Sequence, residues 1–129
     1  MLTLENEVKE IFTIEQMLPA IGQGVIALQC KEDDQDTLNI IKKINHKETF
    51  YCVQAERSLL KVIGGDCDTA IGGLAHISNE KIFLKSELFS NDGKKKFQAQ
   101  SFGNFREAKE IGYKVGKELL KKAGSDFKT

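Results

Sequence analysis

The sequence predicts an α+β domain in which helices pack on one face of a three-stranded antiparallel sheet, with a helix–strand tail in front of this domain. Three observations support this fold class. Apolar residues recur at helical spacing up to about residue 63 and again from residue 105, whereas they alternate with polar residues in the stretch between. The connections between the alternating stretches are short, so neighbouring strands pair. The apolar helix stripes then need one sheet face for their burial, which gives a layered arrangement.

The first 30 residues predict the tail. Its opening stretch has apolar residues at helical spacing with charged residues between them, namely Leu4, Val8, Ile11 and Phe12. Pro19 prevents this helix from continuing. The apolar run at residues 25–28 is typical of a short buried strand, and the charge cluster at residues 31–36 marks a segment boundary.

Two helices are predicted between residues 34 and 63. The first has acidic residues at its start and Lys42 and Lys43 at its end, as the helix dipole favours. We expect Asn45 to cap the second helix, because Glu48 follows at capping-box spacing, and Gly64 to stop it. The two apolar stripes are Leu38, Ile41 and Ile44, and then Cys52, Ala55, Leu59 and Ile63. Cys52 is therefore interpreted as a core residue.

Strands are predicted over residues 70–78, 81–90 and 96–102, with a hairpin turn at residues 91–93. The middle strand should place four alternate side chains on one face: Ile82, Leu84, Ser86 and Leu88. Asn104 is expected to cap a last helix, which Gly124 closes. The stripe of that helix is Phe105, Ala108, Ile111, Val115 and Leu119. We interpret the basic run at residues 94–96 as a solvated part of the hairpin.

Charge and composition exclude several function classes. The 19 basic and 19 acidic residues cancel, whereas nucleic-acid binding favours a positive excess, so no nucleic-acid partner is expected. No apolar run approaches the length of about 18 residues that a membrane helix requires. The first residues lack the features of a signal peptide, which makes the cytoplasm the default location. The three cysteines are widely spaced, and neither His46 nor His76 lies at metal-ligand spacing from one, so neither a zinc site nor a disulfide is expected.

Residues 22–27 match the dinucleotide-binding pattern Gly-x-Gly-x-x-Ala, but the context excludes that function. The true motif follows a strand and begins a helix, whereas this one follows a proline turn and leads into an apolar run. Gly22 and Gly24 are better explained as a hinge that permits close backbone approach.

Cys67 is the strongest candidate for chemistry, because it stands in the glycine-rich loop that follows the second predicted helix. The alternative is a small buried hydrophobic residue at a turn. Asp66, Asp68 and the negative end of the helix dipole all disfavour a thiolate at this position. Cys67 therefore looks poorly suited to be a protease-type or redox nucleophile.

Four motifs at matching intervals resemble the hydroxymethylbilane synthase family, also called porphobilinogen deaminase. They are residues 18–30, residues 45–49, the tripeptide 55–57 and a cysteine ten residues beyond Arg57, which is Cys67. The resemblance implies that Cys67 carries the dipyrromethane cofactor through a thioether, and that Gln23 and Gly24 face the catalytic cleft near it. The family is a transferase of haem and tetrapyrrole biosynthesis that polymerises porphobilinogen on this primer.

The resemblance covers only about the last third of a family member. It implies that residues 1–30 are the C-terminal tail and hinge of a second, α/β domain, and that residues 31–129 form the C-terminal cofactor-attachment domain. Substrate-binding arginines belong to the other two domains, and this chain has only Arg57 and Arg106. We therefore expect it to be inactive alone and to act on porphobilinogen only with the missing N-terminal domains.

Two further expectations follow from the resemblance. The tail has lost its usual partner, so its apolar residues should pack against the following domain in a new way or against a second copy of the chain. One residue of the adjacent pair Glu56 and Arg57, which point to different helix faces, should pair with another domain. The chain departs from the family at Ala70, where proline is usual, and in the order of residues 64–66. The rival interpretation is a non-catalytic α+β interaction module in which Cys67 is inert.

Overall fold

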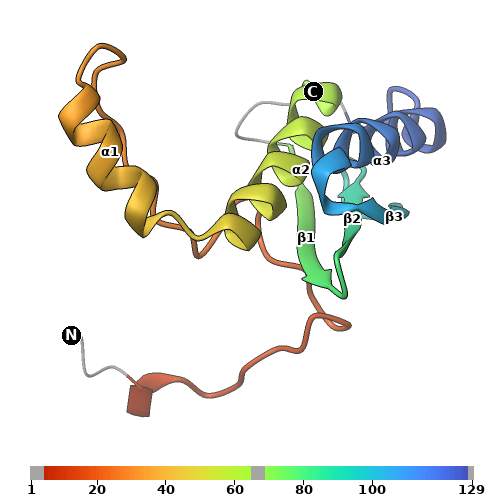
Figure 1. Cartoon of the computed structure of the whole chain (residues 1–129). Coiled ribbons are helices and arrows are strands. Elements are labelled where there is room, and N and C mark those ends of the chain that lie inside the picture. Colours follow the sequence, from red (N-terminus) through yellow and green to blue (C-terminus); the bar gives the residue numbers. More distant parts are fainter. Residues whose placement is uncertain (1–4, 65–68, 128–129) are drawn as a thin grey trace.

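The computed structural model describes residues 5–64 and 69–127 (Figure 1). A 3-10 turn at Glu5–Glu7 is followed by α1 (Gln35–Ile44) and α2 (Lys47–Ile63). Strands β1 (Ile71–Ser78), β2 (Lys81–Phe89) and β3 (Lys96–Asn104) come next, then a 3-10 turn at Phe105–Glu107 and α3 (Ala108–Ala123). The predicted α+β class is confirmed, and the boundaries of the strands and of the last two helices agree with the expected ranges within a few residues.

The three strands form an antiparallel sheet in the order β1-β2-β3. The expected inward face of β2 is confirmed, because all four of its alternate side chains are buried: Ile82, Leu84, Ser86 and Leu88. The opposite face carries a row of stacked rings across the strands, formed by His76, Phe83 and Phe102. Among the described residues, the helices that pack on the sheet, α2 and α3, lie on the other face.

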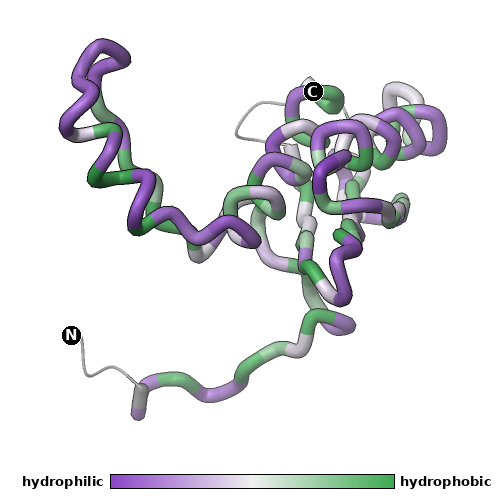
Figure 2. Tube along the Cα trace, viewed as in Figure 1, coloured by the Kyte–Doolittle hydropathy of each residue, from purple (hydrophilic) through white to green (hydrophobic). Residues whose placement is uncertain are grey.

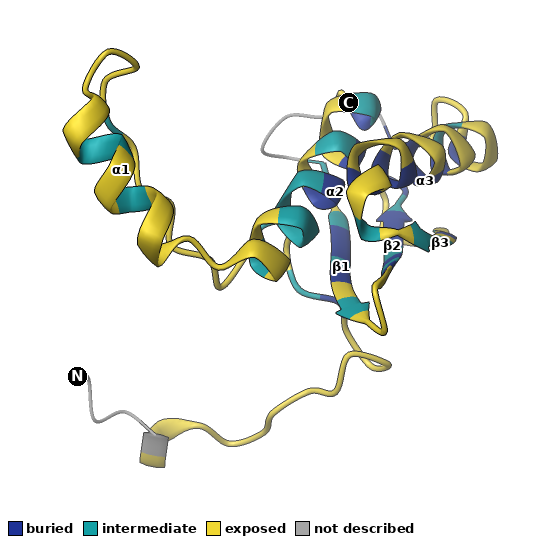
Figure 3. Cartoon of the chain, viewed as in Figure 1, coloured by how far each residue is buried: buried dark blue, intermediate teal, exposed yellow. Residues whose placement is uncertain are grey.

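Helices α2 and α3 form the layer that covers this face, and the buried residues gather between them and the sheet (Figure 3). The two helices approach closely because α3 has glycine at two contact positions. A side chain at Gly112 would overlap with the backbone carbonyl of Ala55, and one at Gly116 would press on Val62. The α3 stripe of Ala108, Ile111, Val115 and Leu119 is buried as predicted.

The ends of α2 confirm one sequence expectation and correct another. Gly64 ends the helix in the left-handed conformation, with φ of 64°, and its N–H donates to the carbonyl of Leu60. The N-cap is His46, which accepts from the N–H of Thr49 at 3.4 Å, so the prediction of Asn45 was wrong. Asn45 instead ends α1, because only two residues separate the helices and the second of them adjoins the first turn of α2.

Helix α1 forms where it was predicted, with Asp34 as its N-cap, but it does not cover the sheet. None of its residues is buried, and it lies away from the sheet layer (Figure 1). Its stripe of Leu38, Ile41 and Ile44 was expected to join the core, and that expectation was wrong. The inner face of the sheet is covered by α2 and α3, which supply the helical part of the core, and α1 supplies no residue to it.

The predicted helix and strand of the tail are also corrected. The described part of the opening stretch contains only the short turn at Glu5–Glu7, and residues 25–28 form no strand. The tail runs outside the domain as an exposed segment with apolar stretches (Figures 2 and 3). Its apolar side chains, expected to pack on the following domain or on a second copy, do not pack on the domain and are exposed in this chain: Val8, Ile11, Phe12, Ile26 and Leu28. A short helix is marginal without tertiary packing, and a strand needs a paired neighbour, so these patterns do not form regular structure without a partner.

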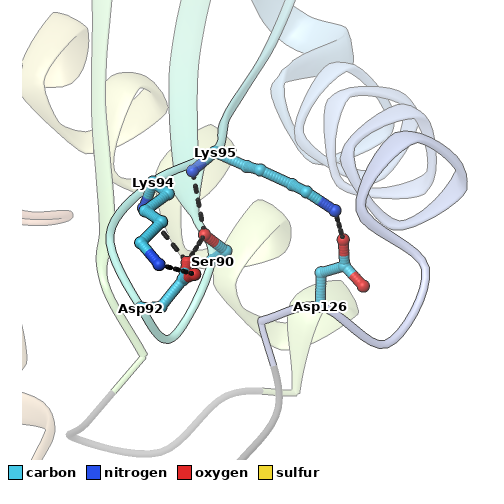
Figure 4. Close-up of polar contacts among 5 residues, drawn as sticks. All are labelled: Ser90, Asp92, Lys94, Lys95 and Asp126. Carbon is cyan, nitrogen blue, oxygen red and sulfur yellow. Dashed lines mark hydrogen bonds and ion pairs between the residues drawn. The ribbon is translucent and has the colours of Figure 1, made fainter.

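The hairpin between β2 and β3 contains the basic run and is exposed, as expected (Figure 4). Asp92 accepts from the hydroxyl of Ser90 at 2.7 Å and from the N–H of Lys94 at 3.1 Å, which closes the turn. These bonds, the Ser90 bond first, lower the pKa of Asp92. Lys95 forms an ion pair with Asp126 at 2.7 Å, which raises the pKa of Lys95 and joins the hairpin to the segment after α3.

Candidate functional site: the hinge turn and the loop after helix α2

The hinge turn, residues 18–24, packs along the edge of β1 that does not face β2. The N–H of Gly73 donates to the carbonyl of Pro19 at 2.9 Å, and Ala20 forms an isolated antiparallel bridge with Gly72. Leu18 is buried at this contact. The hinge turn therefore covers an edge whose backbone groups would otherwise be unpaired.

Two glycines of β1 make this close approach possible. A side chain at Gly72 would come within 3.1 Å of the Leu18 Cβ and 3.3 Å of the Pro19 carbonyl oxygen, and one at Gly73 would overlap with Ile21. Ser86 of β2 donates its hydroxyl to the carbonyl of Gly72 at 2.7 Å. The glycines at 72 and 73 thus provide the space in which the hinge turn lies.

Glu56 connects the hinge turn to the domain. It lies in the middle of α2 and is buried. One carboxylate oxygen accepts from the N–H of Gly22 at 2.7 Å, and the other accepts from the N–H of Ala75 in β1 at 2.8 Å. Its neighbour Arg57 is exposed, which confirms that the two side chains point to different faces. Glu56 therefore pairs with the hinge turn.

Gln23 and Gly24, the predicted cofactor-facing residues, are both exposed at the outer end of the hinge turn. The side-chain oxygen of Gln23 accepts from the N–H of Ala20 at 3.2 Å, so this side chain helps to close its own turn. Gly22 and Gly24 have φ values of 72° and 77°, which glycine adopts most readily. The hinge interpretation of these glycines is consistent with this geometry, and no helix follows them as a dinucleotide motif would require.

Cys67, the predicted anchor, lies outside the described residues. The described ends of its loop are Gly64, at the end of α2, and Ala70, whose carbonyl accepts from the N–H of Phe89 at 3.0 Å. The loop therefore joins the end of α2 to the start of β1, and Gly72 and Gly73, which contact the hinge turn, follow directly. A cysteine thiol is the group that forms a thioether with a carbon electrophile. The hinge turn contacts Gly72 and Gly73, two and three residues after Ala70 in the sequence.

The two other cysteines are both half-buried and free. Cys52 packs against the core, in line with its predicted position on the apolar stripe. Burial, followed by the charges of Glu56 and Glu48, raises the pKa of Cys52 to about 11. Because the thiolate is the reactive form, Cys52 competes poorly for electrophiles.

Sequence reasoning left the role of Glu56 open. A sequence feature that points to it is its position beside Ala55 and four residues after Cys52, which places a carboxylate next to an apolar stripe. Such a group requires hydrogen-bond donors when it is buried. The donors themselves lie 34 and 19 residues away in the chain, where spacing alone gives no indication of them.

The described residues lack two further features. They contain no group of three or more histidine, cysteine, aspartate or glutamate side chains that could hold a metal ion. None of the helices in residues 5–64 and 69–127 combines the length and the apolarity that crossing a membrane demands. The expected cytoplasmic location and the expected lack of a nucleic-acid partner stay predictions.

Fold and hinge define a two-layer α+β domain whose first strand is bordered by a turn from a preceding segment. The sequence profile described as "Porphobilinogen deaminase, C-terminal domain" matches residues 50–121, which is more than half of the chain. A second profile, "Porphobilinogen deaminase, dipyromethane cofactor binding domain", matches residues 1–39. The chain belongs to the porphobilinogen deaminase family.

Curated relatives named porphobilinogen deaminase match almost the whole chain. The protein from Coxiella burnetii (strain CbuG_Q212) is 41% identical over 126 residues, which are 98% of this chain and 41% of the relative. The protein from Desulforamulus reducens is 37% identical over 120 residues, and that from Listeria monocytogenes serotype 4a is 39% identical over 125 residues. They cover 93% and 95% of this chain, and 39% and 40% of those relatives. The chain thus spans about two fifths of the length of these relatives.

Proposed function

We propose that this chain is the cofactor-carrying part of a hydroxymethylbilane synthase and that Cys67 anchors the dipyrromethane primer. The observation that carries the proposal is the order of elements along the chain: Cys67 follows the end of α2 and precedes β1, the strand that the hinge turn borders. The family membership supports it, and the profile named for this cofactor, which matches residues 1–39, supports the cofactor itself. The complete enzyme is then a transferase that extends the primer with porphobilinogen units to a linear tetrapyrrole.

The thiol of Cys67 adds to the methylene carbon of an azafulvene, which forms from a pyrrole that has lost ammonia or water. The S–H bond breaks as the sulfur–carbon bond forms, and the ring nitrogen takes up one proton and becomes a pyrrole N–H. This reaction suits a weakly acidic thiol, since the partner is a strong electrophile. Asp66 and Asp68 flank the sulfur in sequence and stabilise the developing cation. Replacing both with asparagine should slow attachment, and unchanged attachment would remove the carboxylates from the proposal.

The domain assignment is part of the same proposal. Residues 1–30 belong to the tail and hinge of a second domain, and residues 31–129 form the attachment domain. The exposed apolar residues of the tail are consistent with a surface that another domain covers. With only Arg57 and Arg106, the chain does not have a set of guanidinium groups to bind several substrate carboxylates. It therefore acts on porphobilinogen only together with the rest of the enzyme, and Arg57, exposed on α2, is available to contact that part.

The test is to co-express the chain with the preceding segment of the Coxiella burnetii relative and to measure tetrapyrrole formation. Intact mass and Ehrlich's reagent should show a dipyrromethane adduct on the wild-type chain and on the matched control Cys52→Ser. Cys67→Ser should show no adduct and no activity. Normal tetrapyrrole formation by Cys67→Ser would overturn the anchoring role of Cys67. A wild-type chain that shows neither an adduct nor tetrapyrrole formation would overturn the whole proposal and favour the non-catalytic interaction module.

A further inference from the structure

The carboxylate of Glu56 joins three parts of the chain that are distant in sequence. The side chain leaves the middle of α2, and its two oxygens accept from Gly22 in the hinge turn and from Ala75 in β1. Hydrogen bonds to an ionised acceptor are shorter and stronger than those between neutral groups. A single side chain thus links the hinge turn to both the helix and the strand.

The choice of a carboxylate follows from the donors at this place. The N–H groups of Gly73 and Ala75 lie along the edge of β1, and Pro19 supplies an acceptor only to the first of them. The N–H of Gly22, a turn residue with φ of 72°, points toward α2 and donates to Glu56. Two converging N–H donors need an acceptor-only group with two oxygens, and glutamate is such a group, whereas glutamine would present an NH₂ to one of the donors.

Helix α2 also connects this contact to the loop that carries Cys67. Glu56 and Gly64 belong to one uninterrupted helix and its cap, eight residues apart, which corresponds to about 12 Å along the axis. The hydrogen bond to Gly22 therefore holds the hinge turn at a set distance from the start of the loop. Helix α2 thus holds the hinge turn through Glu56 and ends at Gly64, where the loop begins.

We propose that Glu56 is a positioning residue that holds the hinge turn on helix α2 and so sets the orientation of the preceding segment relative to this helix and its C-terminal cap, Gly64. The structural part of this statement stands on the contacts of Glu56 alone. The consequence for catalysis rests on the proposed function.

The first test measures backbone amide hydrogen exchange by NMR in the whole chain. In the wild type, the Gly22 amide should exchange at least about tenfold more slowly than an unstructured amide. In Glu56→Ala it should exchange about tenfold faster than in the wild type, because a charge-assisted hydrogen bond is lost, and in Glu56→Gln at least one of the Gly22 and Ala75 amides should do so. The core amide of Val115 should keep its rate, and the matched control Glu48→Gln, an exposed glutamate on the same helix, should leave Gly22 unchanged. An unprotected Gly22 amide in the wild type, or equal rates in wild type and folded variants, would overturn the proposal.

The second test uses the co-expressed enzyme. Glu56→Gln should load the primer on Cys67 to the wild-type extent by intact mass, yet lower kcat about tenfold with little change in KM, since it shifts domains and removes no substrate contact. Wild-type kcat in this variant would overturn the functional part. If wild-type Cys67 stays unloaded while Gly22 exchange accelerates in the variants, the proposed function fails and the structural role of Glu56 stands. If Cys67 is loaded and Gly22 exchange is unaffected, only the role of Glu56 fails.

Discussion

Residues 47–127 and the segment before them contain apolar side chains of the same kinds, but these side chains are largely buried in the first region and exposed in the second. In the domain, Leu59, Ile82 and Val115 are completely buried. Of the tail and α1, as far as their burial is described, only Leu18 is buried, and Ile11 and Ile26 are 85% and 90% exposed. The difference shows that apolar periodicity specifies which side chains seek a partner, whereas the structure depends on whether a partner is present.

The largest expected effect is a difference in unfolding free energy between alanine substitutions in the two regions. Leu59→Ala should lower the free energy of unfolding by about 2–5 kcal/mol, because it leaves a cavity in the core. Ile26→Ala should change it by less than about 0.5 kcal/mol, because this side chain contacts mainly solvent. Urea unfolding followed by circular dichroism measures both. A comparable loss for Ile26→Ala would mean that the tail is buried in solution, as in the self-association that the sequence predicts as one alternative.

The next effect compares the cysteines of the two regions. Burial raises the pKa of Cys52 from 9.0 to about 11, so at about pH 8 its thiolate is roughly 100-fold scarcer than in the unfolded chain. Alkylation of Cys52 by iodoacetamide should therefore be about 100-fold slower in the native protein than in urea. Mass spectrometry of labelled peptides gives this rate, and Cys30, in the segment before α1, is the internal reference. Equal rates for Cys52 in both conditions would contradict the packing of α2 described above.

The smallest effect is a pH dependence confined to α1. The side-chain and backbone hydrogen bonds from Thr37 lower the pKa of Asp34 below 3.8, its ordinary value. A lowered pKa means that the cap stabilises the helix above that value and loses its contribution as the pH falls through the folded pKa. The helical NMR shifts of residues 35–44 should therefore weaken below pH 3.8 before those of α3 change. Asp34→Asn keeps a capping oxygen and should remove this transition, and a transition that persists in it would assign the effect to another group.

Much of the fold could be predicted from the sequence, and the reason lies in the domain's own elements. The alternation through β2 and the stripe of α3 both report burial against elements of the same domain, so pattern and structure agree. The same reasoning failed for residues 8–12 and 25–28, where the pattern is equally clear but no neighbour covers it. Capping failed at Asn45 because a two-residue link leaves no room to distinguish it from His46.

The candidate site was predictable in part. The turn glycines Gly22 and Gly24 indicated a hinge, because few other residues adopt their conformation. The role of Glu56 could not be predicted, because its donor Gly22 lies 34 residues away and becomes a neighbour only once the hinge turn lies along β1. The assignment of Cys67 rests on family resemblance and the order of elements, and it stays a prediction.

The place of α3 in the chain bears on how the protein is made. This helix supplies Ile111, Val115 and Leu119 to the core, yet it follows every other element that it covers. A ribosome adds about 5–20 residues per second, so the apolar surfaces of α2 and of the sheet that α3 covers stay exposed while α3 is being synthesised. Such surface is prone to aggregation during that interval, and a product that stops before residue 108 exposes it permanently.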